Sequence, residues 1–239
     1  DGLGLKINEY QTGCYKISDD KDNEMYFVNG LLTTITDSND NEIQIHYTHS
    51  DGTSASNGYP NASGDRISKI VQKNNGGSAI TVATFGYSSD NWLKTVTDAA
   101  GNVYSLIYTS GGKLSEIKRG STVIAQYGAA SARMSYAYDA EAQYGVAFTY
   151  DGGKIGSYYE ITSASTAAKP GAIVEVSHLA NGQTCYRDYG RDRVKGKNTD
   201  GKCDDILTYY TFDYAGRTVN AYTTDDSNNI LGASNAVYS

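Results

Sequence analysis

Proline and cysteine are scarce in this chain. Its 239 residues include 2 Pro, 3 Cys, 1 Trp, 4 Phe and 3 His. With so few prolines, the turns have to be made mostly by Gly, Asn and Asp. The three cysteines contain no C-x-x-C pair, which argues against a zinc ribbon. Two alternatives stay open for them: a bridge between Cys185 and Cys203, or three free thiols, which we favour.

Long hydrophobic runs and an excess of positive charge are also missing. No apolar run approaches the ~20 residues that cross a bilayer. The formal net charge is -7, which argues against non-specific binding to nucleic acids or to an anionic membrane. We therefore expect no nucleic-acid partner and no membrane insertion. Because the chain begins at Asp1 rather than Met, we interpret it as a fragment of a larger protein.

Tyrosine is the residue that the chain has in excess, with 22 Tyr against 4 Phe and 1 Trp. A tyrosine carries a large apolar ring and a hydroxyl group that can stay in water or find a partner. Such residues suit β-sheets that bury one face and leave the other wet. The composition therefore favours an all-β chain with half-buried sheet surfaces.

An internal repeat explains much of this composition. Leu32–Tyr47 aligns without a gap with Leu93–Tyr108, and the two share the pattern L-x-x-[IV]-T-D-x-x-[DG]-N. Apolar residues at every second position indicate a strand with one buried face. The central D-x-x-[DG]-N is turn chemistry, since Asp caps a turn and Gly or Asn tolerates a positive φ. Each copy is therefore predicted to be a β-hairpin.

Weaker copies of the opening strand recur at 66–70, 113–117 and 217–222. From this series we predict an all-β fold in which consecutive antiparallel β-hairpins form one curved, shell-like or spiralling sheet. The whole chain, 1–239, is taken as a single β-repeat domain. Interruptions rich in Ser, Asn, Gly or charged residues are interpreted as insertion loops at 50–64, 163–171 and 188–205.

Three segments resemble the RHS-repeat and YD-repeat family: F-D-x-x-G-R-T at Phe212–Thr218, Y-D-G-G-K-I at Tyr150–Ile155, and the block Gly30–Ile43. The resemblance implies a scaffold, because such repeats wind into a hollow shell. In bacterial toxins of this family the shell encloses a C-terminal toxic payload. The implied partners are neighbouring repeats of the parent chain and an enclosed C-terminal domain, and the implied location is extracellular or on the bacterial cell surface.

The residues that carry the repeat are assigned structural roles. No toxin domain and no self-cleaving end of an RHS core is recognisable, so we expect no enzymatic activity from this segment. The structural set consists of Asp37, Asn41, Asp98, Gly101, Asn102, Tyr150, Asp151, Phe212, Asp213, Gly216 and Arg217.

One loop has a spacing of oxygen ligands that suits a metal ion. Asn198, Asp200, Asp204 and Asp205 could wrap a structural calcium ion, and the alternative, which we favour, is a solvated acidic turn. No other cofactor is expected. The stretch 37–41 also has the opening spacing of a calcium loop, but it lacks the glycine that should follow.

Two other classes of function are weighed against the scaffold. An extracellular carbohydrate-binding or adhesion module would use exposed tyrosines to pack on sugar rings. A glycan-active hydrolase would use paired carboxylates such as 204–205, 225–226 or 19–20, which we interpret as turn residues. His46 aligns with Ile107 of the matching copy, which indicates a sheet surface rather than a catalytic triad.

Overall fold

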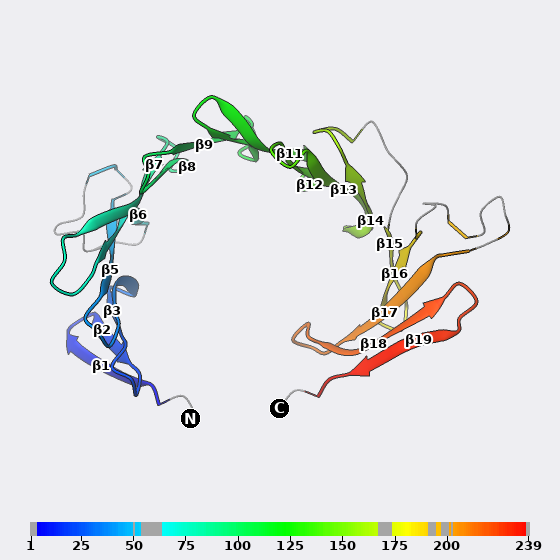
Figure 1. Cartoon of the computed structure of the whole chain (residues 1–239), viewed down its shortest axis with the longest axis horizontal. Coiled ribbons are helices and arrows are strands. Elements are labelled where there is room, and N and C mark those ends of the chain that lie inside the picture. The colour runs from blue at the N-terminus through cyan, green and yellow to red at the C-terminus, as the bar shows by residue number, and fades with distance from the viewer. Residues whose placement is uncertain are drawn as a thin grey trace. The chain divides into compact units, whose positions relative to one another are not determined.

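The computed structural model describes residues 4–49, 51–53, 64–166, 174–190, 195–196, 201 and 203–237. These residues form nineteen β-strands and contain no helix (Figure 1). In this part of the chain, accordingly, no helix has the length and apolar character needed to cross a membrane. The prediction of an all-β fold is confirmed. Most of the predicted loop 50–64, and parts of 163–171 and 188–205, lie outside the described residues.

Two compact units make up the chain. Unit 1 comprises Asp1–Ile107 with Ile117–Thr122, and unit 2 comprises Tyr108–Glu116 with Val123–Ser239. The first nine strands are β1 Lys6–Gln11, β2 Cys14–Ser18, β3 Glu24–Val28, β4 Leu31–Thr36, β5 Glu42–Thr48, β6 Arg66–Lys73, β7 Ile80–Tyr87, β8 Leu93–Asp98 and β9 Val103–Tyr108. The remaining ones are β10 Leu114–Arg119, β11 Thr122–Ala130, β12 Arg133–Asp139, β13 Tyr144–Asp151, β14 Lys154–Ile161, β15 Val174–His178, β16 Thr184–Asp188, β17 Ile206–Phe212, β18 Thr218–Asp225 and β19 Ile230–Asn235.

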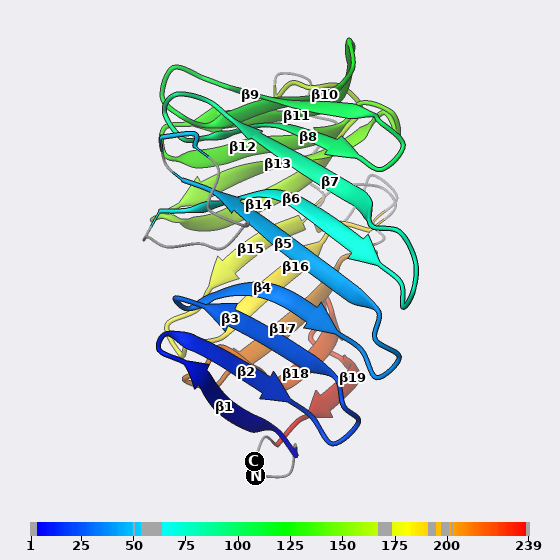
Figure 2. The same ribbon diagram turned by 90° about the vertical axis from the view of Figure 1, so that its left-hand side faces the viewer.

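The strands belong to one open antiparallel sheet with a simple order. In unit 1 each strand from β1 to β8 pairs with the strand that follows it in the chain. In unit 2 the same holds from β11 to β18. Figure 2 shows the strands of unit 1 side by side, with turns at both ends of the strands. The predicted series of consecutive hairpins is confirmed.

The two copies of the internal repeat form equivalent hairpins. In the first, Thr34 pairs with Gln44 and Thr36 with Glu42. In the second, Thr95 pairs with Ser105 and Thr97 with Val103. Every pair in the second copy lies 61 residues after its counterpart, as the sequence alignment requires. The register of a hairpin was therefore encoded in the repeat.

Tyrosine rings build the core of unit 2 by lying over small residues. Ala147, Tyr159 and Ile161 are fully buried on one face of β13 and β14, and Tyr136 and Tyr138 of β12 pack against them. The register places Tyr136 opposite Ala147. A large ring beside a small residue fills the space that the small side chain leaves, and cross-strand contact of this kind stabilises a sheet.

An even smaller residue lies opposite a tyrosine at Gly145, which is buried and pairs with Tyr138. A Cβ atom there would lie 2.4 Å from the carbonyl oxygen of Ala137 and 2.8 Å from the Cα of Tyr138. Both contacts are with backbone atoms, which cannot rotate away. The close approach of β12 and β13 therefore requires glycine at this position.

The cysteines are all described, and Cys14, Cys185 and Cys203 are free thiols. Of the two alternatives left open by the sequence, the structure has the three free thiols. Cys185 is buried, and its burial raises the pKa of the thiol.

We predict that Gly145→Ala lowers the free energy of unfolding by about 1–3 kcal/mol, because the added methyl group overpacks a backbone contact. Gly232→Ala is the matched control. Gly232 also lies in a strand, but nothing stands within 4 Å of a Cβ added there. Denaturant unfolding measures both variants. Equal stability of the two would contradict the packing argument.

Candidate functional site

A five-residue turn recurs throughout the chain. The N–H group of its first residue donates to the C=O group of the fifth. In the copies other than that at Asp19, the N–H group of the fourth residue also donates to the C=O group of the first. The fourth residue has a positive φ in each copy, which favours Gly, Asn or Asp. The first residues of these turns are Asp19, Asp37, His49, Ser88, Asp98, Thr109, Leu179, Asp213 and Asp225.

Where aspartate begins the turn, its side chain completes it. The Oδ1 atom of Asp98 accepts hydrogen bonds from the N–H groups of Ala100 and Asn102, each at 2.9 Å. Its Oδ2 atom accepts one from the Asn102 amide at 2.8 Å. Asp37 makes the same three bonds with Asn39 and Asn41. These contacts account for the D-x-x-[DG]-N pattern as a turn, with Asn as the partner of Asp.

The turn at Asp213 follows this plan with a different fifth residue. Asp213 accepts hydrogen bonds from the N–H groups of Ala215 and Arg217, and Gly216 has a φ of 78°. The guanidinium of Arg217 donates from Nε to Asp213 Oδ2 at 2.7 Å. The carboxylate that Arg217 binds therefore belongs to its own turn.

Tyr150 and Asp151 lie at a shorter turn. Asp151 pairs with Lys154, and the two residues between them, Gly152 and Gly153, have φ values of 53° and 96°. Two successive positive φ angles define the two-residue turn that matches the twist of a hairpin. The segment Y-D-G-G-K therefore resembles the longer repeat in its strands, but a two-residue turn replaces the five-residue turn.

β-Bulges recur where the strand that follows a turn begins. In three of them one extra residue interrupts the register of the second strand: Thr33 in β4, Ser68 in β6 and Ser135 in β12. A bulge increases the local twist and leaves the backbone around it partly unpaired. A hydrogen-bond donor from elsewhere is then needed for the carbonyl groups beside the bulge.

Tyrosines supply that donor from the next strand. The hydroxyl group of Tyr47 in β5 donates to the carbonyl of Leu32 at 2.6 Å, directly before the bulged residue of β4. The Tyr87 hydroxyl donates in the same way to Ile67 at 2.8 Å. The Tyr150 hydroxyl is 2.7 Å from the carbonyl of Met134, its acceptor. We call this contact the tyrosine–bulge link.

Because each of these strands pairs on both sides, it belongs to two hairpins. The link joins two hairpins that each contain a bulge, β3–β4 to β5–β6 for Tyr47 and β11–β12 to β13–β14 for Tyr150. Tyr47 lies opposite Ile67, the residue beside the next bulge, and Tyr150 lies opposite Ile155. One residue thus contacts the bulge of the preceding hairpin through its hydroxyl group and the next bulge through its backbone. The carbonyl oxygen of Ile155, unlike that of Ile67, lies near a histidine: Nε2 of His178 is 3.3 Å from it.

Arginine covers two of the three linking rings. The guanidinium of Arg66 lies 4.6 Å from the centre of the Tyr87 ring, and that of Arg133 lies 5.3 Å from the Tyr150 ring. Both arginines directly precede the residue whose carbonyl accepts the tyrosine hydroxyl. A cation over an aromatic face is attracted to it and shields the ring from water. The triplets Arg-Ile-Ser and Arg-Met-Ser therefore mark the link in the sequence.

Burial favours the protonated form of two of the linking hydroxyl groups. It raises the pKa of Tyr47, which has 6% of its surface exposed, and that of Tyr87. A protonated phenol can donate its hydrogen bond across the physiological pH range. Phe212, which stands in the corresponding place at the end of β17, has no hydroxyl group and so cannot make this link.

An ion-pair cluster of unit 2 joins β16 to the turn after β18. Arg187 Nη1 lies 2.7 Å from Asp205 Oδ2 and 2.7 Å from Asp226 Oδ1. The Asp205 side chain has no exposed surface, and Gly196 donates its N–H group to the same Oδ2 atom. Burial opposes the charge of Arg187, but its bonds to both carboxylates outweigh this and raise its pKa. The bond from Arg187 lowers the pKa of Asp226.

This cluster bears on two hypotheses from the sequence. Asn198 and Asp200 of the predicted calcium loop lie outside the described residues. Asp205 is directed at Arg187, which supplies the positive charge, and the Asp204 carboxylate lies against Gly190. Cys203, Asp205 and Asp226 have potential ligand atoms within 4.8 Å of one another, but the guanidinium already binds both carboxylates.

The carboxylates proposed for hydrolysis have local partners as well. Asp205 and Asp226, from different pairs in the sequence, both bind Arg187, and the bond from Arg187 lowers the pKa of Asp226. Asp19 and Asp225 accept the hydrogen bonds of their own turns. His46 lies in β5 opposite Lys69, and burial, followed by the charge of Lys69, lowers its pKa. These positions suit a sheet held by turns and ion pairs.

Sequence reasoning did not find the Arg187 cluster or the tyrosine–bulge links. Arg187 and Asp226 are 39 residues apart, and no local pattern predicts such a contact. The links had a visible signal in the repeated Arg-x-Ser triplets at 66–68 and 133–135, but its meaning depends on knowing where the bulges lie.

No family model and no curated protein sequence matches this chain. Its fold is similar to that in the crystal structure of TcdB2-TccC3-Cdc42, with a TM-score of 0.52 and 10% identity, over 91% of this chain and 13% of that one. A crystal structure of TcdB2-TccC3 aligns with 92% of this chain over 10% of its own, at 12% identity and a TM-score of 0.38. At such identities the likeness concerns the fold alone.

We predict that Tyr47→Phe lowers the free energy of unfolding by about 1 kcal/mol, because it removes the donor to the Leu32 carbonyl and keeps the ring. Tyr214→Phe is the control, since Tyr214 is 100% exposed at a turn. Thermal and denaturant unfolding measure the difference. A Tyr47 variant as stable as the control would show that the link contributes nothing.

The aspartate turns predict loss of stability in acid. Hydrogen bonds from Asn lower the pKa of Asp19, Asp37, Asp98 and Asp225 below the ordinary value of 3.8, and the Arg217 N–H group does so for Asp213. A carboxyl whose pKa is lower in the folded state stabilises the fold above its ordinary pKa. That contribution disappears as the pH falls through the lowered, folded-state pKa.

We therefore expect these carboxylates to cause no change in melting temperature with pH near neutrality. The melting temperature should fall as the pH drops below about 4. The double variant Asp37→Asn/Asp98→Asn should be less stable than the wild type at pH 7, and the difference should shrink in acid. Circular dichroism melting curves from pH 7 to pH 3 provide the measurement. A difference that is independent of pH would contradict the role of the ionised carboxylates.

Proposed function

We propose that this chain is a non-enzymatic structural segment of a larger RHS-like repeat shell, extracellular or at a bacterial cell surface, whose sheet encloses another polypeptide of the same assembly. The observation that carries the proposal is the tyrosine–bulge link. It occurs in both units, and in each case it joins one hairpin to the one before it. Contacts that run only to neighbouring repeats are typical of proteins that extend by adding units.

The turns support the same role. Each aspartate that begins a turn has its oxygens occupied within that turn, as Asp98 does with Ala100 and Asn102. Carboxylates used in this way hold the ends of strands together. They are poorly suited to proton transfer, which requires a pKa near the working pH.

The arrangement of the buried charges points in the same direction. A hydrolase with two carboxylates needs one of them protonated, so its pKa has to be raised. Arg187 has the opposite effect, since it lowers the pKa of Asp226 and pairs with Asp205. This cluster therefore favours anchoring of β16 over catalysis.

Likeness in fold to TcdB2-TccC3-Cdc42 adds support from outside the chain. The chain spans 13% of the length of the chain it matches there, which is compatible with one segment of a long repeat array. The RHS and YD resemblance of Tyr150–Ile155 and Phe212–Thr218 supports the same class of protein. Enclosure of a polypeptide is the function that the family resemblance suggests for such an array.

Limited proteolysis of the parent protein, with its native flanking sequence, tests the proposal. We predict that a flanking polypeptide is protected in the wild type and is cut faster in the triple variant Tyr47→Phe/Tyr87→Phe/Tyr150→Phe. The triple variant removes three donors that join hairpins and leaves every ring in place. Tyr214→Phe should retain the protection. Mass spectrometry identifies the fragments and gives their rates of appearance.

Cleavage of all flanking sequence at the same rate in the wild type and the triple variant would contradict enclosure. Folding of the repeat segment itself is monitored in parallel by circular dichroism. This separates a shell that has loosened from a chain that has unfolded.

A further inference from the structure

An aromatic groove lies on one face of unit 2. Its walls include Tyr158 of β14, Tyr186 of β16 and both Tyr210 and Phe212 of β17, and Asp188 lies at the end of β16. The groove has a volume of about 440 Å³. The scaffold does not use these residues in its tyrosine–bulge links or its ion-pair cluster. Four rings and a carboxylate thus share one concave surface.

Strand registers explain how the groove arises. Tyr186 lies opposite Thr208, so a small side chain stands beside the large ring, two residues from Tyr210 on the same strand. Tyr158 lies opposite Val174, which is nearly buried and forms part of the floor. The rings therefore stand on three strands, β14, β16 and β17, with the smaller side chains of Thr208 and Val174 beside them.

The rings are held at defined angles. Tyr186 and Tyr210 meet edge to face, with ring centres 5.5 Å apart and an interplanar angle of 89°. Tyr210 and Phe212 are near parallel, with centres 6.3 Å apart and an angle of 19°. Rings that stand at right angles form the corner of a box rather than a flat platform. A flat platform is what the broad face of a sugar ring requires.

The charge of the groove has one sign. Asp188 is among its lining residues, and the Gly190 N–H group donates to Asp188 Oδ1 at 3.0 Å and so orients the carboxylate. Of the described residues that line the groove, none is Lys, Arg or His. The Asp188 charge lies close enough to act on Tyr158, whose pKa is raised by burial and then by Asp188. The groove should therefore repel anions.

We propose that this aromatic groove binds a small organic cation with a quaternary ammonium head group. The faces of aromatic rings carry partial negative charge and attract such cations, most strongly where water is displaced. A quaternary head group has no N–H donors, so it loses little when ring faces replace its hydration. The Asp188 carboxylate adds a full negative charge at the end of the groove.

Choline chloride is the probe, and 3,3-dimethyl-1-butanol is the matched control because it has the same shape without the charge. Titration of the folded chain is followed by NMR and calorimetry, with sodium chloride added to equalise ionic strength. We expect choline to bind at least about tenfold more tightly than its neutral analogue. Equal affinity for the two compounds would overturn the proposal.

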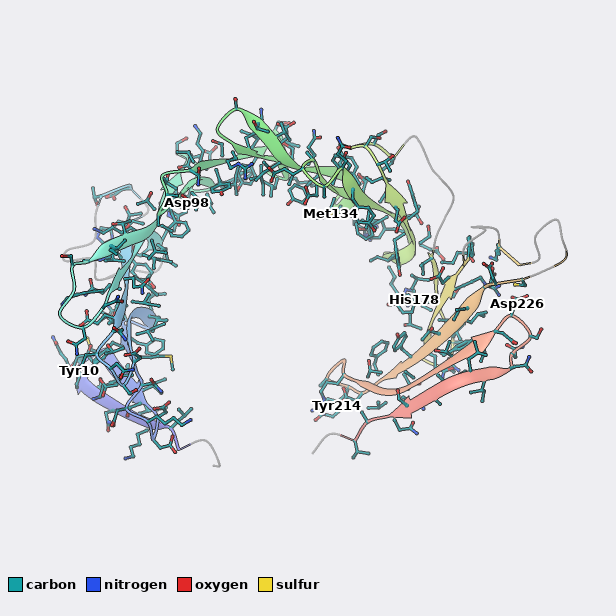
Figure 3. The ribbon with its side chains drawn as sticks, viewed as in Figure 1. Tyr10, Asp98, Met134, His178, Tyr214 and Asp226 are labelled. Carbon is teal, nitrogen blue, oxygen red and sulfur yellow. The ribbon has the colours of Figure 1, made fainter. Side chains whose placement is uncertain are left out.

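Variants locate the site. Tyr210→Leu keeps an apolar side chain but removes a ring face, and Asp188→Asn removes only the charge. Each should weaken choline binding about fivefold or more. Tyr214→Leu is the control, because Tyr214 belongs to the same hairpin but stands fully exposed at its turn (Figure 3). It should bind choline as the wild type does.

Three further outcomes decide against the proposal. One is loss of choline binding in Tyr214→Leu to the same extent as in Tyr210→Leu. Another is that the single variants Asp188→Asn and Tyr210→Leu both fold and both keep the full affinity for choline. The third is binding of cellobiose, a neutral sugar, in the absence of choline binding, which would assign the groove to carbohydrates. Should Tyr210→Leu fail to fold, Asp188→Asn decides alone, since it changes neither the rings nor the size of the side chain.

Discussion

The hydrogen bond from a tyrosine hydroxyl group to the carbonyl beside a bulge connects the local and the long-range order of this chain. A bulge twists a strand and disturbs its ladder, which would weaken an ordinary hairpin. Tyr47, Tyr87 and Tyr150 each satisfy a carbonyl at that point from the next strand. The distortion that introduces twist is thus tied to the contact that attaches the following hairpin.

This link depends on the hydroxyl group that distinguishes tyrosine from phenylalanine. Phenylalanine could fill the same space over Gly145 or Ala147, but it has no donor for a carbonyl group. A sheet with few deeply buried residues gains little from apolar contact alone, since isolated hairpins are marginal in water. The hydroxyl group adds a directed bond where hydrophobic burial is incomplete. The excess of 22 Tyr over 4 Phe is consistent with this need.

Much of the fold could be predicted from local sequence. The ungapped match of Leu32–Tyr47 to Leu93–Tyr108 predicts one register for both hairpins, because period-two burial excludes a one-residue slip and the shared turn pattern sets where the strands meet. Asp98 and Asn102 were recognisable as turn residues because Asp caps such turns and Asn is common in them. The bulge at Ser68 was not, because an extra residue leaves the alternation on either side of it intact.

The charged cluster illustrates the other limit. The run 188–205 was interpreted as a charged insertion loop, in which a solvated acidic turn was favoured over a calcium site. Arg187, one residue earlier, is the partner of Asp205, and Asp226 reaches it from the turn after β18. Nothing within any one of these segments encodes the meeting, since it depends on β16, β17 and β18 lying side by side.

Burial then determines what the cluster contributes. A side chain such as Asp205, with no exposed surface, is tolerated only when its charge is compensated, and removal of one partner leaves the other charge buried. Arg187 compensates two carboxylates at once, so it holds Asp205 and the turn that carries Asp226 at the same strand, β16. The turns hold the ends of each hairpin and the tyrosines join successive hairpins. Arg187 adds a third kind of contact, because it binds Asp205, the residue directly before β17, to β16.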